Sequence, residues 1–127
     1  MIRLYAPVAY WQADEATSAS VVGGCGPGGV GDWLVPDIIW GLNVKPACRI
    51  HDWMYYFGEC NADKKAADRS FRNNMVRLIA GTPARRTTVR IRLWLAERYY
   101  KAVKKYGGPA FWDNKNDKSE MGEVENG

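Results

Sequence analysis

Apolar positions at helical spacing predict a long helix over Asn61–Ala80. The stripe at intervals of three and four residues that faces inward consists of Asp68, Phe71, Met75 and Leu78. Asn61 is a suitable N-cap, and Asp63 lies in the first turn, where the helix dipole favours an acidic side chain. Gly81 follows the last apolar position and ends the helix.

A further helix is predicted over 83–106, with Thr82 as its cap and Pro83 in its first turn. Its expected inner face is formed by Val89, Leu93, Ala96, Tyr100 and Val103. The remaining faces are basic and carry Arg85, Arg86, Arg90, Arg92, Arg98, Lys101, Lys104 and Lys105. The sequence Gly107-Gly108-Pro109 ends this helix.

An earlier helix is predicted around His51, the only histidine of the chain, with Pro46 in its first turn. Cys48, His51, Asp52 and Tyr55 are spaced at i, i+3, i+4 and i+7 and therefore share one face. Any acid–base chemistry by imidazole near neutral pH depends on His51. An isolated His-Asp pair is more often a buried, hydrogen-bonded cluster than a catalytic one. The residues around it must therefore decide between a structural and a catalytic role.

Asp68 is anomalous because it stands at the head of an apolar stripe. A buried carboxylate needs a partner, since unrelieved desolvation would favour its neutral form. His51 is the obvious candidate. The alternative is that Asp68 lies at a solvated margin and pairs with Arg72.

Glycines dominate residues 23–31, with five in the seven-residue sequence Gly23-Gly24-Cys25-Gly26-Pro27-Gly28-Gly29. Such a sequence forbids regular structure and lets backbone carbonyls turn toward a common centre. It is either a functional loop or a flexible linker. The following stretch, 32–43, holds two tryptophans and five aliphatic residues, too many for a short loop to bury, and the exposed remainder indicates a binding surface.

The length and the charge of the chain limit the classes of protein to which it could belong. The 127 residues suit one domain, and residues 1–22 are expected to form a short helix or an irregular arm. Apolar runs are too short for a transmembrane segment, and residues 1–12 are too interrupted for a signal peptide. Residues 1–112 hold sixteen basic and nine acidic residues, a net of +7, which suits an anionic surface. Residues 113–127 are polar, carry a net −3, and are predicted to be disordered.

These motifs together resemble the secreted phospholipase A2 superfamily, most closely its bacterial and parvovirus-capsid branches. The resemblance covers about residues 21–107 of a phospholipase A2-like domain spanning 1–112. It consists of a glycine-rich loop, a helix with Cys-x-x-His-Asp and a later tyrosine, and an Asp-x-x-Phe on a second helix. In this chain they are Cys25-Gly26-Pro27-Gly28-Gly29, Cys48-Arg49-Ile50-His51-Asp52-Trp53-Met54-Tyr55 and Asp68-Arg69-Ser70-Phe71.

The resemblance implies an all-α fold in which two long antiparallel helices carry the catalytic pair, with a third C-terminal helix and a glycine-rich calcium loop. It implies calcium-dependent hydrolysis of the sn-2 ester of glycerophospholipids. His51 would act as general base on water, Asp68 would orient the imidazole, and Tyr55 would support Asp68. Ca²⁺ would be bound by the Asp52 carboxylate and the carbonyls of Gly24, Gly26 and Gly28, with the Gly26 N–H as an oxyanion donor.

The resemblance also implies a Cys25–Cys48 disulfide that ties the loop to the helix and leaves Cys60 over. A lipase of this type needs an apolar rim at the membrane, for which the candidates are Trp33, Ile38, Ile39 and Trp40. The expected partner is therefore a phospholipid surface, contacted by a peripheral monomer that is secreted or otherwise delivered outside the producing cell.

The chain departs from the animal members in lacking their dense disulfide framework and in the insert over 33–44. The separation of Asp68 from His51 is also shorter than in many relatives. Three alternatives stay open. They are a catalytically silent phospholipase-like module that binds membrane or protein, a basic nucleic-acid binder, and a zinc site from the three cysteines and His51. The nucleic-acid alternative has no recognised reading motif. The cysteine spacing lacks a paired Cys-x-x-Cys.

Overall fold

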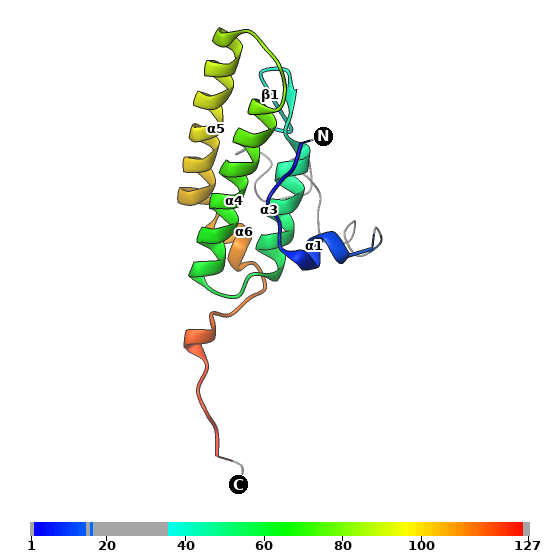
Figure 1. Ribbon diagram of the computed structural model, residues 1–127. Helices are drawn as coiled ribbons and strands as arrows, with labels where there is room; N and C mark the ends of the chain where they lie inside the picture. The colour runs from blue at the N-terminus through cyan, green and yellow to red at the C-terminus, as the bar shows by residue number, and fades with distance from the viewer. Residues whose placement is uncertain (1, 15, 17–35, 126–127) are drawn as a thin grey trace.

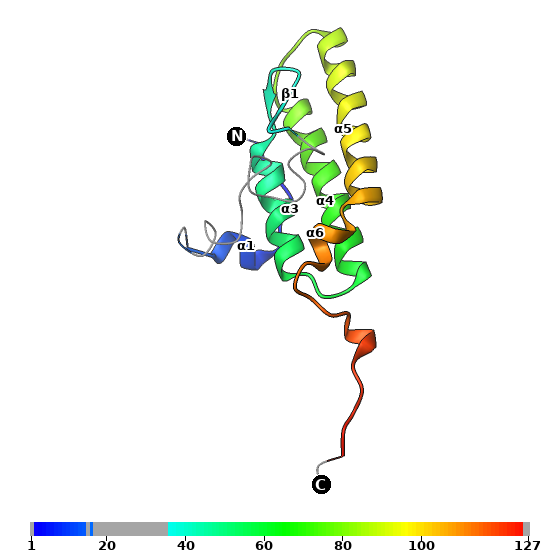
Figure 2. The same cartoon turned by 180° about the vertical axis from the view of Figure 1, so that it is seen from behind.

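A computed structural model describes residues 2–14, 16 and 36–125. Its main body is a row of three helices, α3 (Lys45–Phe57), α4 (Asn61–Ala80) and α5 (Arg86–Tyr106). They run down, up and down in succession, with α4 between the other two (Figure 1, and from behind in Figure 2). The described part of the chain is therefore predominantly helical, which confirms the predicted all-α class.

The predicted bounds of α4 are confirmed, but its cap is not. Cys60, rather than Asn61, is the N-cap residue, and it makes no side-chain cap bond. Asp63 lies in the first turn as predicted, where its Oδ2 accepts the backbone N–H of Glu59 at 2.8 Å. This bond satisfies a donor just before the helix.

The third long helix, α5, begins at Arg86 instead of 83. The Thr82 hydroxyl donates to the Leu78 carbonyl at 2.8 Å, so Thr82 serves the end of α4 and not the start of α5. The residues between 81 and 85 form the connection between the two helices.

The inward stripe predicted for α4 is buried throughout: Asp68, Phe71, Met75 and Leu78. The face predicted for α5 is partly wrong. Leu93 is 40% exposed, whereas Arg92, which we placed on an outer face, is buried. The buried face of α5 instead follows Val89, Arg92, Ala96, Tyr99 and Val103. Arg92 is accommodated there because its Nε donates to the Trp40 carbonyl at 3.1 Å.

Residues 38–43 form a hairpin where the sequence predicted a loop. Strand β1 (Ile38–Ile39) pairs antiparallel with β2 (Leu42–Asn43) through the two-residue turn Trp40-Gly41. Both turn residues have positive φ, 47° at Trp40 and 78° at Gly41. Positive φ at both positions is the signature of a type I′ turn, whose twist matches that of the flanking strands.

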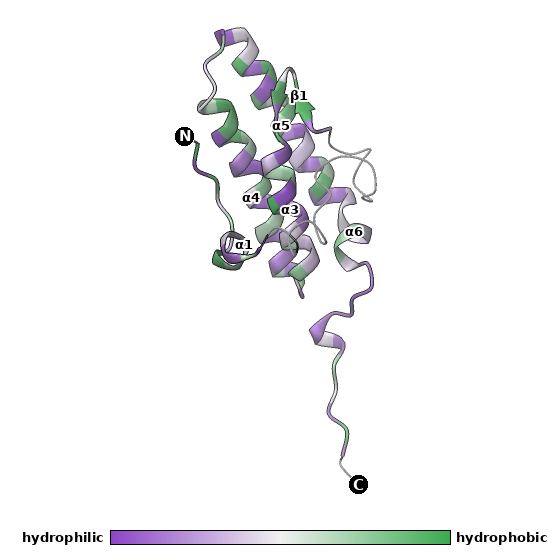
Figure 3. Ribbon diagram, turned by 90° about the vertical axis from the view of Figure 1, so that its right-hand side faces the viewer, coloured by the Kyte–Doolittle hydropathy of each residue, from purple (hydrophilic) through white to green (hydrophobic). Residues whose placement is uncertain are grey.

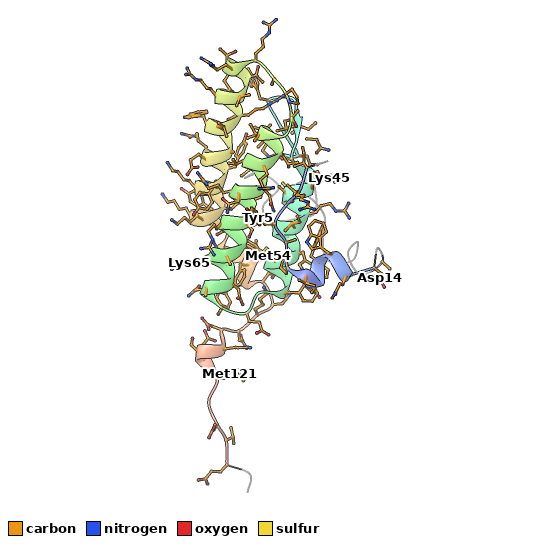
Figure 4. All side chains as sticks on the ribbon, in the orientation of Figure 1. Tyr5, Asp14, Lys45, Met54, Lys65 and Met121 are labelled. Carbon is orange, nitrogen blue, oxygen red and sulfur yellow. The ribbon has the colours of Figure 1, made fainter. Side chains whose placement is uncertain are left out.

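The N-terminal arm lies against α4 and includes α1 (Val8–Gln12), in agreement with the predicted short helix or arm. The buried Asn74 of α4 bonds the backbone of Tyr5 twice, accepting from its N–H at 2.6 Å and donating to its carbonyl at 2.8 Å (Tyr5 is labelled in Figure 4). The Asn74 side chain therefore satisfies both backbone groups of Tyr5, as a neighbouring strand would.

After α5 the chain turns into α6 (Gly108–Trp112), whose Phe111 packs edge-on against Tyr55, with ring centroids 5.3 Å apart. The following residues extend away from the bundle and are mostly hydrophilic (Figure 3), with one turn of 3₁₀ helix at Lys118–Glu120. The predicted disorder of this tail stays a prediction. Within the described part of the chain, no helix combines the length and apolar character needed to cross a membrane.

Candidate active site

His51 and Asp68 meet between α3 and α4. His51 Nε2 lies 2.8 Å from Asp68 Oδ1, and the two residues are only 7% and 2% exposed. The pairing of these two residues was predicted, and the solvated Arg72 alternative is wrong, because Arg72 Nε bonds Glu97 instead at 2.8 Å. A carboxylate accepts from Nε2–H, so the neutral imidazole presents Nδ1 as its basic nitrogen.

Aromatic rings fix the plane of the imidazole. Phe71 of α4 stacks on it with a centroid distance of 4.6 Å and an interplanar angle of 28°. The ring of Tyr55, one turn further along α3, lies 4.1 Å away at 47°. The helical spacing that the sequence shows, His51 to Tyr55 and Asp68 to Phe71, produces these contacts.

Tyr55 also bonds Asp68. Its hydroxyl donates to Oδ1 at 2.6 Å, the same oxygen that faces His51. Burial raises the pKa of Tyr55 above its ordinary value, and the charge of Asp68 and the hydrogen bond to it raise the pKa further. The phenol therefore stays a donor throughout the ordinary pH range. The supporting contact predicted for Tyr55 is present.

Lys64 completes the shell around Asp68, and the sequence did not single it out. Its Nζ donates to Asp68 Oδ2 at 2.8 Å and to the carbonyls of Val103 at 3.1 Å and Lys104 at 3.4 Å. The only signal in the sequence is the i, i+4 spacing of Lys64 and Asp68, which usually indicates a weak surface pair. Here the side chain of Lys64 is only 12% exposed.

Burial and hydrogen bonding oppose each other in setting the charge of the pair. Desolvation lowers the pKa of His51, and the bond to Asp68 and its charge offset this only in part. Desolvation raises the pKa of Asp68, but hydrogen bonds from His51, Lys64 and Tyr55 outweigh it and leave the pKa below its ordinary value. Near neutral pH the pair is therefore a neutral imidazole beside a carboxylate, the charge state that a general base requires.

The predicted metal site can be followed only in part. Asp52 lies next to His51 on α3 and is half-buried, whereas Gly24, Gly26 and Gly28 lie outside the described residues. Over 2–14, 16 and 36–125, no three His, Cys, Asp or Glu side chains are grouped so that they could hold a metal ion. The donors predicted for Ca²⁺ do not require such a group, since one carboxylate plus backbone carbonyls is an oxygen set that suits a hard cation.

The cysteines bear on both the disulfide and the zinc alternative. Cys48 is buried on α3, Cys60 is a free and partly buried thiol at the start of α4, and Cys25 lies outside the described residues. The Cys25–Cys48 bridge therefore stays a prediction. Cys48, Cys60 and His51 do not gather into a metal-binding group, which leaves the zinc alternative without support from the residues described.

The predicted membrane rim is divided by the hairpin. Ile38 and Trp40 are exposed, the latter by 58%, but Ile39 is 1% exposed and belongs to the core. Placing Ile39 on the rim was wrong, because successive side chains of a strand point to opposite faces. Trp33 lies outside the described residues.

Comparison with known proteins adds no relative. Neither the family models, nor the curated proteins, nor the solved structures contain a match to this chain.

Proposed function

We propose that this protein is a calcium-dependent phospholipase A2 that hydrolyses the sn-2 ester of glycerophospholipids. The observation that carries the proposal is the buried pair His51–Asp68, held at 2.8 Å between two antiparallel helices. A structural cluster needs only satisfied hydrogen bonds. This pair also leaves one imidazole nitrogen basic and has an additional, half-buried carboxylate, Asp52, as its immediate neighbour.

In the proposed reaction, His51 Nδ1 takes a proton from a water that attacks the ester carbonyl. Asp68 keeps the imidazole in the Nε2–H tautomer and stabilises the imidazolium once it forms. The imidazolium then returns its proton to the departing alkoxide, so the base is regenerated. Tyr55 holds the Asp68 carboxylate in the orientation that this requires.

Calcium fits the donors that the sequence offers. Asp52 would hold the ion together with the carbonyls of Gly24, Gly26 and Gly28, and the bound ion supplies charge stabilisation to the substrate phosphate and the developing oxyanion. The N–H of Gly26 would donate to the same oxyanion.

The test is fatty-acid release from mixed-chain phosphatidylcholine vesicles by the full chain, with Ca²⁺ and with chelator. We expect release from the sn-2 position only in Ca²⁺. His51→Gln should lose at least about a hundredfold in rate, as removal of a general base does. The control is Tyr56→Phe, a change at an exposed residue on the same helix, which should keep the wild-type rate.

The same assay addresses the silent membrane- or protein-binding module. A folded protein that binds vesicles but releases no fatty acid in Ca²⁺ would contradict the enzymatic proposal. Asp52→Asn provides a second check. It should weaken Ca²⁺ binding measured by calorimetry, because a neutral amide replaces the charged ligand. Undiminished Ca²⁺ affinity in this variant would remove Asp52 from the metal site.

A further inference from the structure

The Asp68 carboxylate is bonded on both oxygens, and the two oxygens have different partners. Oδ1 accepts from His51 and Tyr55 of α3, and Oδ2 accepts from Lys64 of α4. Since Asp68 is almost fully buried, each of these bonds replaces water that the carboxylate cannot reach. Lys64 is thus the only partner recorded for Oδ2 among the residues that the structure describes.

The ammonium of Lys64 is itself held in place by the end of a second helix. Its ammonium reaches the carbonyls of Val103 and Lys104 at the C-terminal end of α5, the negative end of the helix dipole. An ammonium has three N–H donors, and three oxygens surround this one. Its position is fixed by two different helices, which distinguishes it from a mobile surface lysine.

We propose that Lys64 is a positioning residue, which holds Asp68 Oδ2 against the end of α5 so that Oδ1 faces His51 and keeps its imidazole in the Nε2–H tautomer. The expected effect of Lys64 on the rate of hydrolysis rests on the proposed function. Its expected effect on the tautomer of His51 does not. Lys64 does not touch the reacting atoms.

The physical reason is the cost of an unsatisfied oxygen. Without the ammonium, Oδ2 would stay buried with no donor. The carboxyl group can relieve this by rotating about its Cβ–Cγ bond or by taking up a proton. Rotation moves the acceptor away from His51 Nε2–H, whereas protonation weakens it, and either change lets the imidazole populate the other tautomer. Tyr55 cannot substitute, because its hydroxyl is already committed to Oδ1.

The experiment compares Lys64→Met with Lys64→Arg and with the matched control Lys65→Met. Lys65 is the next residue of α4 and is exposed (Figure 4), so its substitution removes the same charge without touching Asp68. Because the chain has a single histidine, the ¹⁵N spectrum of its imidazole reports the tautomer directly. Spectra are recorded near pH 7.5 with chelator present.

We expect wild type, Lys65→Met and Lys64→Arg to show the Nε2–H tautomer, and Lys64→Met to show a mixture. In Ca²⁺, kcat on a soluble short-chain phospholipid should fall on the order of tenfold in Lys64→Met with KM unchanged, in line with the loss of other supporting residues. If Lys64→Met does not fold, Lys64→Leu, which likewise offers no donor to Oδ2, takes its place and should also show a mixture.

A Lys64→Met protein that is less stable but keeps the wild-type tautomer would overturn the proposal and leave Lys64 a purely structural residue. An equal change of tautomer in Lys65→Met would overturn it as well, since the effect would then come from net charge. If wild type shows no hydrolysis, the proposed function fails, and the ¹⁵N comparison still decides whether Lys64 positions Asp68.

Discussion

Gly107 leaves space for the hydroxyl of Tyr55. A Cβ placed on Gly107 would lie 2.4 Å from Tyr55 Oη and 2.4 Å from the Val103 carbonyl oxygen. The backbone of Gly107 has φ −78°, which any residue can adopt, so the requirement for glycine is one of space and not of conformation. The end of α5 therefore limits where the tyrosine that bonds Asp68 can lie.

Gly107→Ala should destabilise the protein by about 1–3 kcal/mol, the usual cost of forcing an extra methyl group into a packed site. Activity should fall as well, because Tyr55 must move away from Asp68. The control is Gly108→Ala, since nothing lies within 4 Å of a Cβ on Gly108. Thermal unfolding and ester release measure the two effects, and equal stability in both variants would contradict the steric argument.

Tyr55→Phe removes one donor from Asp68 Oδ1 while keeping the ring that packs on Phe111. The bond goes to a charged acceptor, so the loss should be about 1.5–3 kcal/mol in the free energy of unfolding. Chemical denaturation measures this. Tyr56→Phe, at the exposed neighbouring tyrosine, should change stability little. A loss of equal size in both variants would mean that removal of either tyrosine hydroxyl destabilises the protein, and that the bond to Asp68 is not the cause.

Stability should decrease as the pH falls below about 6.5. The pKa of His51 is lowered in the folded protein, so below the unfolded value of 6.5 the unfolded chain binds a proton that the native chain does not. The free energy of unfolding should fall by up to about 1.4 kcal/mol per pH unit until the folded pKa is reached. With chelator present, His51→Gln should flatten the curve just below pH 6.5. An unchanged slope would contradict the buried, neutral imidazole.

At lower pH, Asp68 adds a second loss. Its folded pKa lies below the ordinary value of 3.8, so its contribution is present above that value and disappears as the pH falls through the folded pKa. This second decline should persist in His51→Gln, because Lys64 and Tyr55 still bond the carboxylate.

Trp40 allows the membrane rim to be tested without damage to the core. It is exposed and has φ 47°, an unfavourable value for a residue with a side chain. Trp40→Gly should therefore keep or slightly raise the melting temperature, and reduce binding to anionic vesicles measured by sedimentation. Trp94→Ala, at an exposed tryptophan of α5, is the control. Unchanged vesicle binding in Trp40→Gly would remove the hairpin from the membrane contact.

The α4 helix and the His51–Asp68 pair could be predicted because the local sequence pattern and the packing of the folded protein agree there. Twenty residues of consistent periodicity define α4, and a carboxylate on its apolar stripe needs a partner that the single histidine supplies. The hairpin at Ile38–Asn43 was missed because its turn has tryptophan where asparagine or aspartate usually precedes glycine.

Lys64 and Arg92 could not be placed from the sequence, because both are buried by contacts that are distant along the chain. Arg92 reaches the carbonyl of Trp40, and Lys64 reaches the last turns of α5. In a helical pattern both are typical solvent-facing residues, and only the packing of the hairpin and of α5 brings acceptors to them. The face of α5 was shifted for the same reason, with Leu93 exposed in place of Arg92.

One carboxylate with three donors makes the order of mutations matter. Losing His51, Tyr55 or Lys64 removes one bond each, but losing Asp68 first leaves all three polar groups without the acceptor that they share. Effects of these changes will therefore be strongly epistatic, and double-mutant combinations will cost less than the sum of their parts once Asp68 is gone. Any evolutionary route that dismantles this site starts most easily with a donor, and a route that starts with the aspartate passes through the least stable intermediate.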